Sequence, residues 1–141
     1  MKTFKSVLGF AFVFAALGAI QAFAQNVTRY DVPFAFSVSG KTLPAGEYRI
    51  SPDQNSTGLV LISSTDGRTT FAMTHNGVAS ASTAQPTLVF HRYGNQYFLA
   101  RISAGEGTAA VMDLPTSKAE REAVTIASNR TVETVTLVAM R

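Results

Sequence analysis

Cysteine is absent from the 141-residue chain, so disulfide bonds and thiolate metal sites are excluded. Histidine is nearly absent: His75 and His91 lie in separate segments, without the paired spacing that zinc sites show. We therefore expect no metal and no other cofactor. The fold has to rely on its hydrophobic core, which a domain of this size can supply without disulfides.

An excess of one charge is also absent once the N-terminal segment is set aside. The whole chain carries 12 basic and nine acidic side chains. Removing Lys2 and Lys5 leaves ten basic against nine acidic side chains, a net charge of +1. A nearly neutral domain is not built to bind nucleic acid or an anionic membrane surface as its main partner.

Motifs for catalysis are missing as well. The sequence has no Gly-x-Ser-x-Gly elbow, and the glycine-containing segment 103–107 lacks the Lys-Ser/Thr ending of a phosphate loop. A Ser-His-acid site is defined by geometry, so a hydrolase remains open as the least favoured hypothesis. We expect that the protein is not an enzyme.

Residues 1–24 match a secretory signal peptide. A short basic start reaches Lys5, an apolar run covers residues 7–20, and Ala22-Phe23-Ala24 forms an A-x-A cleavage site. We expect cleavage after Ala24 and export to the periplasm or beyond the cell, with no stable membrane span afterwards. The remaining residues 25–141, 117 in number, are the size of one domain.

From residue 25 onward the hydrophobic pattern is that of β-strands. Tyr30, Val32, Phe34, Phe36 and Val38 alternate with more polar residues, which predicts one strand with a single buried face. Pro33 cannot donate a ladder hydrogen bond, so this strand is expected to lie at an edge or to contain a bulge. Segment 59–63 is apolar on both faces and is expected to be a central strand. Further strands are expected at 47–51, 69–74, 87–93, 97–102, 109–113 and 131–140.

One short helix is expected near residues 117–123. Ser117-Lys118-Ala119-Glu120 matches a capping box, in which the Ser117 hydroxyl accepts from the Glu120 backbone and the Glu120 side chain reaches back. Lys118 and Glu122 lie one turn apart and are expected to pair. On this interpretation Glu120 and Glu122 both lie on a solvated helix face.

Seven or eight short strands with one helix predict an all-β fold, a single small antiparallel β-barrel or β-sandwich. The sequence does not decide between the two. A strand as apolar as residues 59–62 favours closure, because it is poorly suited to an open edge.

The hairpin at residues 87–102 is the most aromatic stretch after the N-terminus, and its register depends on the turn. A two-residue Gly94-Asn95 turn of type II′ would place Phe90 against Leu99. A three-residue loop, Tyr93 to Asn95 with Asn95 left-handed, would place Phe90 against Phe98. We expect the three-residue loop, because it gathers one set of apolar side chains on one face, and their burial outweighs turn preference. That set is Leu88, Phe90, Phe98, Ala100 and Ile102.

The other face of this hairpin then carries His91, Tyr93, Tyr97 and Arg101. One interpretation is an outer sheet face partly covered by loops, since antiparallel sheets commonly leave one face solvated. The other is a contact surface, because these residue types are typical interface anchors. These four residues are the candidate site.

Three segments together resemble an uncharacterised family of small exported β-rich bacterial proteins, frequent in soil bacteria. They are residues 32–48 (with Val32-Pro33-Phe34-Ala35-Phe36 and Leu43-Pro44-Ala45-Gly46), residues 88–99, and residues 114–122. No activity is attached to that family, so the resemblance implies export and one β-domain and supplies no functional residues. Separately, residues 43–50 are similar to a turn and strand in transthyretin-like and carboxypeptidase-regulatory-like sandwiches.

The favoured hypothesis is a non-enzymatic, secreted or periplasmic binding module. It would use an interior cavity or the candidate surface to hold a small apolar or sugar-like ligand, or another envelope protein. It predicts a pocket of roughly 300 Å³ or more. The alternative is a structural or assembly component of the cell envelope that associates through strand edges near Pro33 or in the final strand. Ligand identity and oligomeric state stay open.

Overall fold

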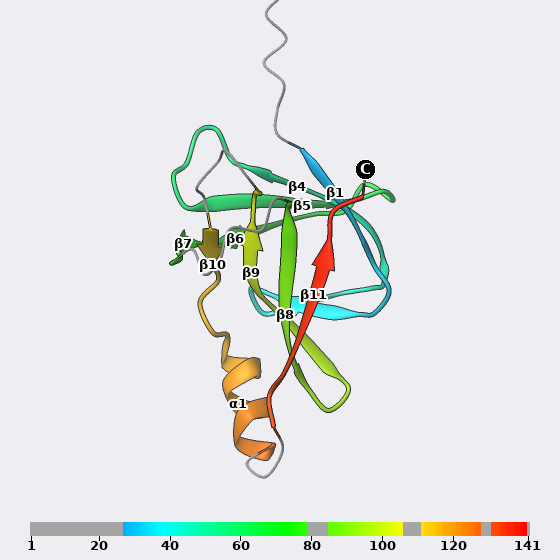
Figure 1. Cartoon of the computed structure of the whole chain (residues 1–141), viewed down its shortest axis with the longest axis vertical. Coiled ribbons are helices and arrows are strands. Elements are labelled where there is room, and N and C mark those ends of the chain that lie inside the picture. The colour runs from blue at the N-terminus through cyan, green and yellow to red at the C-terminus, as the bar shows by residue number, and fades with distance from the viewer. Residues whose placement is uncertain (1–26, 79–84, 106–110, 128–130, 141) are drawn as a thin grey trace, which may run out of the picture.

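The computed structural model of the chain is mostly β, with one short helix (Figure 1). It describes residues 27–78, 85–105, 111–127 and 131–140. The expected signal peptide and its cleavage site lie outside these residues. The described elements, in chain order, are β1 (Thr28–Val32), β2 (Phe36–Val38), β3 (Lys41–Leu43), β4 (Gly46–Pro52), β5 (Leu59–Ser64), β6 (Thr69–Met73), β7 (His75–Asn76), β8 (Thr87–Tyr93), β9 (Gln96–Ser103), β10 (Val111–Asp113), α1 (Lys118–Ile126) and β11 (Glu133–Val138).

The strands form two curled sheets, which confirms the all-β fold class. The N-terminal sheet is antiparallel, in the order β1-β4-β5-β6, with the apolar strand β5 paired on both sides as expected. The C-terminal sheet runs β11-β8-β9-β10-β7. Strand β2 joins it through one parallel contact with β9 and forms a hairpin with β3. The described strands number eleven, because the first expected strand is divided into β1 and β2 and the short strands β3 and β7 were not expected.

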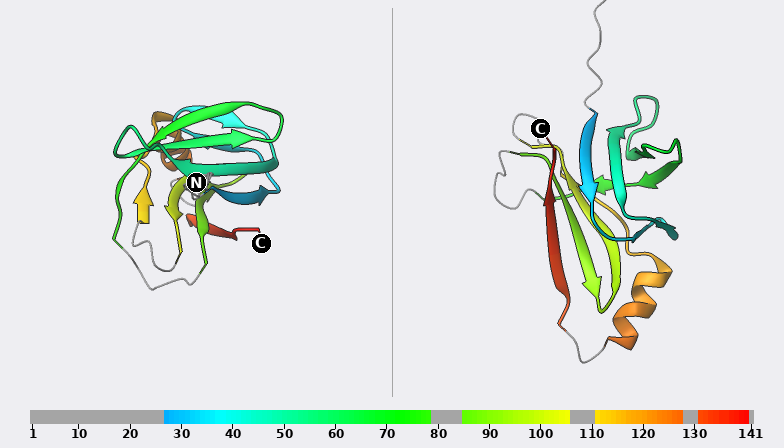
Figure 2. Two further views of the ribbon diagram at one scale, coloured as in Figure 1. Left: turned by 90° about the horizontal axis from the view of Figure 1, so that it is seen from above. Right: turned by 90° about the vertical axis from the view of Figure 1, so that its right-hand side faces the viewer.

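The two sheets meet on both sides of the core, so the fold combines features of a barrel and a sandwich (Figure 2). On one side β6 ends at Met73 and β7 begins at His75, so the chain passes between sheets within one residue. On the other side the Met140 N–H donates to the Arg29 carbonyl at 2.9 Å, which joins the end of β11 to β1. We call this second junction the β1–β11 seam.

The first expected strand is interrupted at Pro33, where the chain leaves one sheet for the other. Strand β1 ends at Val32 and pairs with β4, whereas β2 begins at Phe36 and joins β9. Proline has no N–H to give to a ladder, so the break falls where the sequence placed a bulge or an edge. The alternation of inward and outward side chains nevertheless continues past Pro33. Tyr30, Val32, Phe36 and Val38 are all buried, and Phe34 is partly buried.

Aromatic rings from both sheets fill the core. Phe36 packs edge-on against Tyr48 and against Phe90, with ring centroids 5.1 and 5.4 Å apart. The Tyr48 hydroxyl also donates to the Pro44 carbonyl in the preceding turn at 2.5 Å. A buried phenol thus keeps a hydrogen-bond partner, as buried polar groups require.

The predicted loop of the β8–β9 hairpin is wrong: the turn has two residues, not three. Tyr93 pairs with Gln96, and Gly94 has φ +62°, whereas Asn95 is not left-handed. A positive φ at the first central position alone is typical of a type II′ turn, which glycine adopts without steric cost.

A bulge reconciles this turn with core packing. Phe90 pairs with Leu99 but Val89 pairs with Arg101, so Ala100 is the extra residue on β9. Leu99 and Ile102, three positions apart, therefore both face the core opposite Phe90 and Leu88. The expectation that Phe98 and Ala100 would join that face is wrong. Phe98 pairs with His91 and is buried on the opposite face. The hairpin therefore keeps its type II′ turn and still buries its apolar side chains, because the extra residue on β9 shifts the pairing of the residues that follow it.

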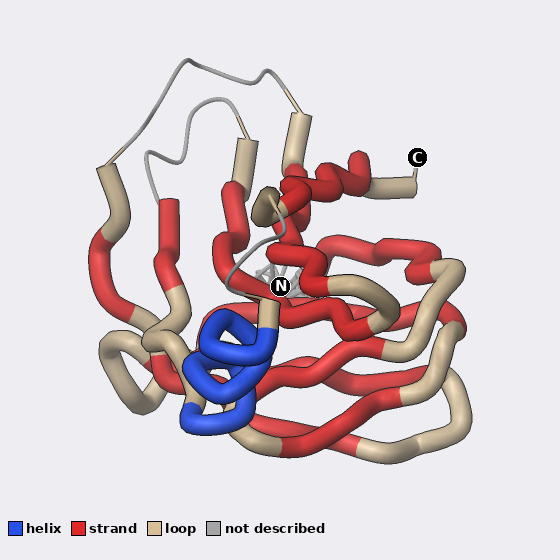
Figure 3. The backbone as a smooth tube through the Cα atoms, turned by 90° about the horizontal axis from the view of Figure 1, so that it is seen from below, coloured by secondary structure: helices blue, strands red, loops and turns tan. Residues whose placement is uncertain are grey.

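Helix α1 begins as expected and ends three residues beyond Ala123, at Ile126 (Figure 3). The Ser117 Oγ accepts from the Glu120 N–H at 3.1 Å, which confirms the N-cap. The exposed pair Lys118–Glu122, 3.8 Å apart, is also confirmed. Within the described residues, no helix combines the length and the apolar character needed to cross a membrane.

Candidate functional site

A row of side chains crosses the C-terminal sheet on the face turned away from the core. Across four neighbouring strands, Val89 pairs with Arg101, Arg101 with Asp113, and Asp113 with His75. Directly opposed residues of antiparallel strands share a face, so these side chains lie side by side. His91 shares this face of β8, two positions from Val89, and Thr134 of β11 pairs with His91.

Arg101 and Asp113 form a two-pronged ion pair within this row. Arg101 Nε donates to Asp113 Oδ1 at 2.5 Å, and Nη2 donates to Oδ2 at 3.1 Å. Both side chains are partly buried. The hydrogen bond that Arg101 donates to Asp113 raises the pKa of Arg101 further above its ordinary value, so the guanidinium stays charged at any physiological pH. The bulge at Ala100 creates this pair, because it aims Arg101 away from the core.

Glu120 of helix α1 is buried against the same face, so the expectation of a solvated Glu120 is wrong. Its Oε1 lies 2.8 Å from His91 Nδ1 and accepts from the Tyr93 hydroxyl at 3.3 Å. Its side chain is only 7% exposed. The carboxylate bonds to the sheet instead of reaching back to the helix cap, so that half of the capping box is wrong too. A buried carboxylate gains more from two donors on the sheet than from one solvated backbone N–H.

This contact fixes the orientation of His91. A carboxylate only accepts, so Nδ1 carries the proton and Nε2 is the nitrogen left for another partner. Tyr93 is also affected: burial, followed by the charge and hydrogen bond of Glu120, raises the pKa of the Tyr93 phenol.

These residues surround a groove of about 490 Å³, which we call the α1 groove. Its sides are the row of side chains, Glu120, and the connection from β10 to α1 at residues 114–116. That connection is tied to the bulge, because the Leu114 N–H donates to the Ala100 carbonyl at 2.9 Å. The bulge at Ala100 of β9 therefore positions both the Arg101–Asp113 ion pair and the connection that forms the opposite wall of the groove.

Several side chains that line the groove carry polar atoms with no hydrogen-bond partner among the described residues. These atoms include one carboxylate oxygen, one guanidinium nitrogen, one imidazole nitrogen and two hydroxyls: Glu120 Oε2, Arg101 Nη1, His91 Nε2, and the Oγ1 atoms of Thr116 and Thr134. Donors, acceptors and groups that can do both thus converge on one space.

Of the four predicted site residues, the structure brings three to this region. His91 and Arg101 line the groove, and Tyr93 supports Glu120 beside it. Tyr97 does not belong, because the two-residue turn places it on the core face. There it stacks on Phe34, with centroids 3.8 Å apart, beneath the Arg92 guanidinium.

The sequence analysis missed Asp113, Glu120, Thr134 and His75 as site residues. Asp113 and Thr134 reach the site through strand pairings across 12 and 43 positions from Arg101 and His91, which no local pattern encodes. Glu120 had no such signal either, because it matched the capping box; only the structure shows that Glu120 and Ala123 are the buried residues of α1.

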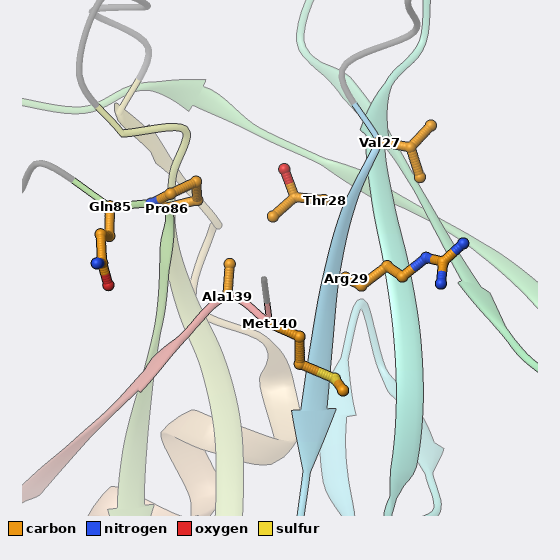
Figure 4. Close-up of a pocket in the computed structure, with 7 residues that line it drawn as sticks. All are labelled: Val27, Thr28, Arg29, Gln85, Pro86, Ala139 and Met140. Atoms are coloured by element: carbon orange, nitrogen blue, oxygen red, sulfur yellow. The ribbon is translucent and has the colours of Figure 1, made fainter.

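A second cavity of about 440 Å³ lies at the β1–β11 seam (Figure 4). Thr28 projects toward Pro86 and Ala139 there, whereas Val27 and Arg29 project from the other side of β1. Arg29 is the charged side chain of its lining, and no ion pair of the described residues lies in it. The seam therefore lacks the convergent polar groups of the α1 groove.

Comparison with known proteins found no match: no family model, no curated protein and no solved structure is similar to this chain. Within the described ranges, no group of three or more His, Cys, Asp or Glu side chains is placed to hold a metal ion.

Proposed function

We propose that the protein is an exported, non-enzymatic binding module and that the α1 groove holds its ligand. The observation that supports this most is the convergence of unpaired polar atoms from β8, β9, β11 and α1 on one space. Its volume of about 490 Å³ lies within the range of roughly 300–1,000 Å³ that is usual for small-molecule sites.

The groups of the groove are preorganised. Arg101 is held by Asp113, and His91 by Glu120, so neither has to be ordered when a ligand arrives. Ordering a long side chain on binding costs about 0.5–1.5 kcal/mol. Sites built on strands and held by neighbouring side chains avoid that cost.

Binding is favoured over hydrolysis by the surroundings of His91. A serine- or threonine-based hydrolase needs a nucleophile hydrogen-bonded to its base. Within the described chain His91 bonds to Glu120, and its cross-strand neighbour Thr134 makes no hydrogen bond to it. Purified protein incubated with chromogenic ester and glycoside substrates should show no turnover. Turnover abolished by His91→Ala would contradict the non-enzymatic proposal.

A small-molecule library screened by thermal shift tests the binding site. A ligand present at ten times its Kd should stabilise the protein by about 1.4 kcal/mol, or roughly 4 °C. Thr134→Tyr should abolish the shift, because Thr134 is an exposed strand residue whose enlargement fills the groove. Thr69→Tyr, on exposed strand β6 of the other sheet, is the matched control and should retain it. Hits that survive Thr134→Tyr would contradict the proposed site.

Export is tested separately. Expressed with its full sequence in a bacterium, the protein should be recovered outside the cytoplasm with the mass of residues 25–141. Recovery of the uncut chain from the cytoplasm would contradict export and leave the groove proposal standing.

An assembly role is the second candidate, supported by the edge position of β11. This strand pairs only with β8 in the described residues and carries the exposed side chains Val138 and, just beyond it, Met140. Exposed edges can add strands from other chains. Sedimentation velocity at rising concentration should show a larger species if this role is correct, and a monomer throughout would exclude self-assembly.

A further inference from the structure

We propose that the α1 groove is selective for a neutral, polyhydroxylated ligand, a saccharide, over ligands that carry a net charge. This inference rests on the proposed function, since it names the class of ligand for the same site. Three observations carry it: the internal partners of the charged side chains in the groove, the polar atoms that have no such partner, and the apolar part of the lining.

The charged side chains of the groove already have hydrogen-bond partners within the protein. Arg101 is neutralised by both oxygens of Asp113, and Glu120 meets His91 and Tyr93. An anionic ligand would approach two carboxylates, and a cationic ligand would approach the guanidinium. Like charges brought together in a partly dehydrated space cost free energy. A neutral ligand avoids both conflicts.

The unpaired atoms suit hydroxyl groups in particular. Glu120 Oε2 belongs to a side chain that is 93% buried, and it has no hydrogen-bond partner among the described residues. It can only accept, whereas Arg101 Nη1 can only donate. A sugar hydroxyl does both, so adjacent hydroxyls of one ring can donate to Glu120 and accept from Arg101. His91 Nε2 and the Thr134 hydroxyl add further partners on the same face.

The groove also offers an apolar surface beside these polar atoms. Val89, Ala100, Leu114 and Pro115 contribute to its lining. A sugar ring has C–H faces as well as hydroxyl edges, and burial of the C–H face adds a favourable term. The groove volume of about 490 Å³ matches a mono- or disaccharide better than a long chain.

The test uses residues 25–141 and sugars that differ in charge on one ring framework. The neutral probes are glucose, galactose, mannose, cellobiose and maltose. The charged probes are glucuronate and galacturonate, which are anionic, and glucosamine and galactosamine, which are cationic. Binding is measured by amide chemical-shift titration up to millimolar concentration, with wild type, Glu120→Gln, Thr134→Tyr and the control Thr69→Tyr.

We expect at least one neutral probe to shift amides of the groove and to bind roughly tenfold or more tightly than its charged counterparts. Glu120→Gln should weaken that binding by roughly tenfold, because a hydrogen bond to a charged acceptor is replaced by one to an amide. Thr134→Tyr, which leaves the Arg101–Asp113 ion pair and the His91–Glu120 hydrogen bond intact, should abolish it, and Thr69→Tyr should not change it.

Preference for a charged probe at the groove would overturn the saccharide inference and leave the proposed function intact. The same holds if none of the neutral probes binds while library compounds still shift the groove amides. If neither sugars nor library compounds reach the groove, the saccharide inference and the proposed function both fail.

Discussion

His91 Nδ1 of strand β8 lies 2.8 Å from Glu120 Oε1 of helix α1, so one hydrogen bond fastens the helix to the sheet across 29 positions of sequence. The Tyr93 hydroxyl reaches the same oxygen at 3.3 Å. This contact holds helix α1, which contributes Glu120 to the α1 groove, against the sheet that contributes the other side.

The first prediction concerns the stability that this contact provides. We expect Glu120→Ala to lower the free energy of unfolding by about 1–3 kcal/mol, because His91 and Tyr93 lose a charged acceptor in a buried site. Urea denaturation of both proteins measures the change. Glu122→Ala is the matched control on the same helix, where the carboxylate is exposed and pairs only with Lys118. Its effect should stay below about 0.5 kcal/mol. Equal effects of the two substitutions would show that Glu120 is not anchored.

The second prediction separates the two turns that the hairpin sequence allows. Gly94 has φ +62°, so Gly94→Ala should cost about 1–2 kcal/mol. Asn95 has a negative φ, so Asn95→Ala should cost much less. Chemical denaturation of the two variants measures the loss of unfolding free energy for each and so distinguishes the two turns. A larger loss for Asn95→Ala would favour the three-residue loop.

The third prediction concerns the Arg101–Asp113 ion pair, which depends on the bulge at Ala100. A double-mutant cycle of Arg101→Met and Asp113→Asn should give a coupling energy of about 1 kcal/mol, because the contact is two-pronged but partly exposed. The coupling should fall as salt is added. Independent, additive effects of the two substitutions would contradict the observed geometry.

The fourth prediction follows from a buried phenol in the core. Burial raises the pKa of Tyr30 to about 12. The folded state therefore holds the Tyr30 proton more tightly than the unfolded state, whose phenol titrates near pH 10. Tyr30 contributes its full stability below pH 10 and loses that contribution as pH rises toward 12. Absorbance at 295 nm should show tyrosine ionisation that continues to about pH 12, and Tyr30→Phe should remove the last part of it. A Tyr30→Phe protein with an unchanged late phase would assign it to another residue.

The sequence predicts local features of this fold well. Alternation identified the inward positions from Tyr30 to Val38 although Pro33 divides them between two sheets, because a two-residue period depends only on neighbours along the chain. Ser117 marked the helix start for the same reason, since an N-cap is a local hydrogen bond.

The features that make the site are not local. The extra residue Ala100 is recognisable only once the pairing of β8 with β9 is known, and that pairing decided which of Phe98 and Leu99 enters the core. Glu120 matched the capping box that begins at Ser117. Nothing in its own segment therefore showed that its carboxylate would bond to His91 instead. Candidate residues on the β8–β9 hairpin were therefore found, and their partners on other elements were not.

The most direct test of the binding site is amide chemical-shift mapping with any compound that stabilises residues 25–141 in the library screen. We predict perturbations that concentrate at His91, Arg101, Asp113 and Glu120 and vanish in Thr134→Tyr. Perturbations that concentrate at Arg29 and Met140 of the β1–β11 seam instead, or that persist in Thr134→Tyr, would contradict this prediction.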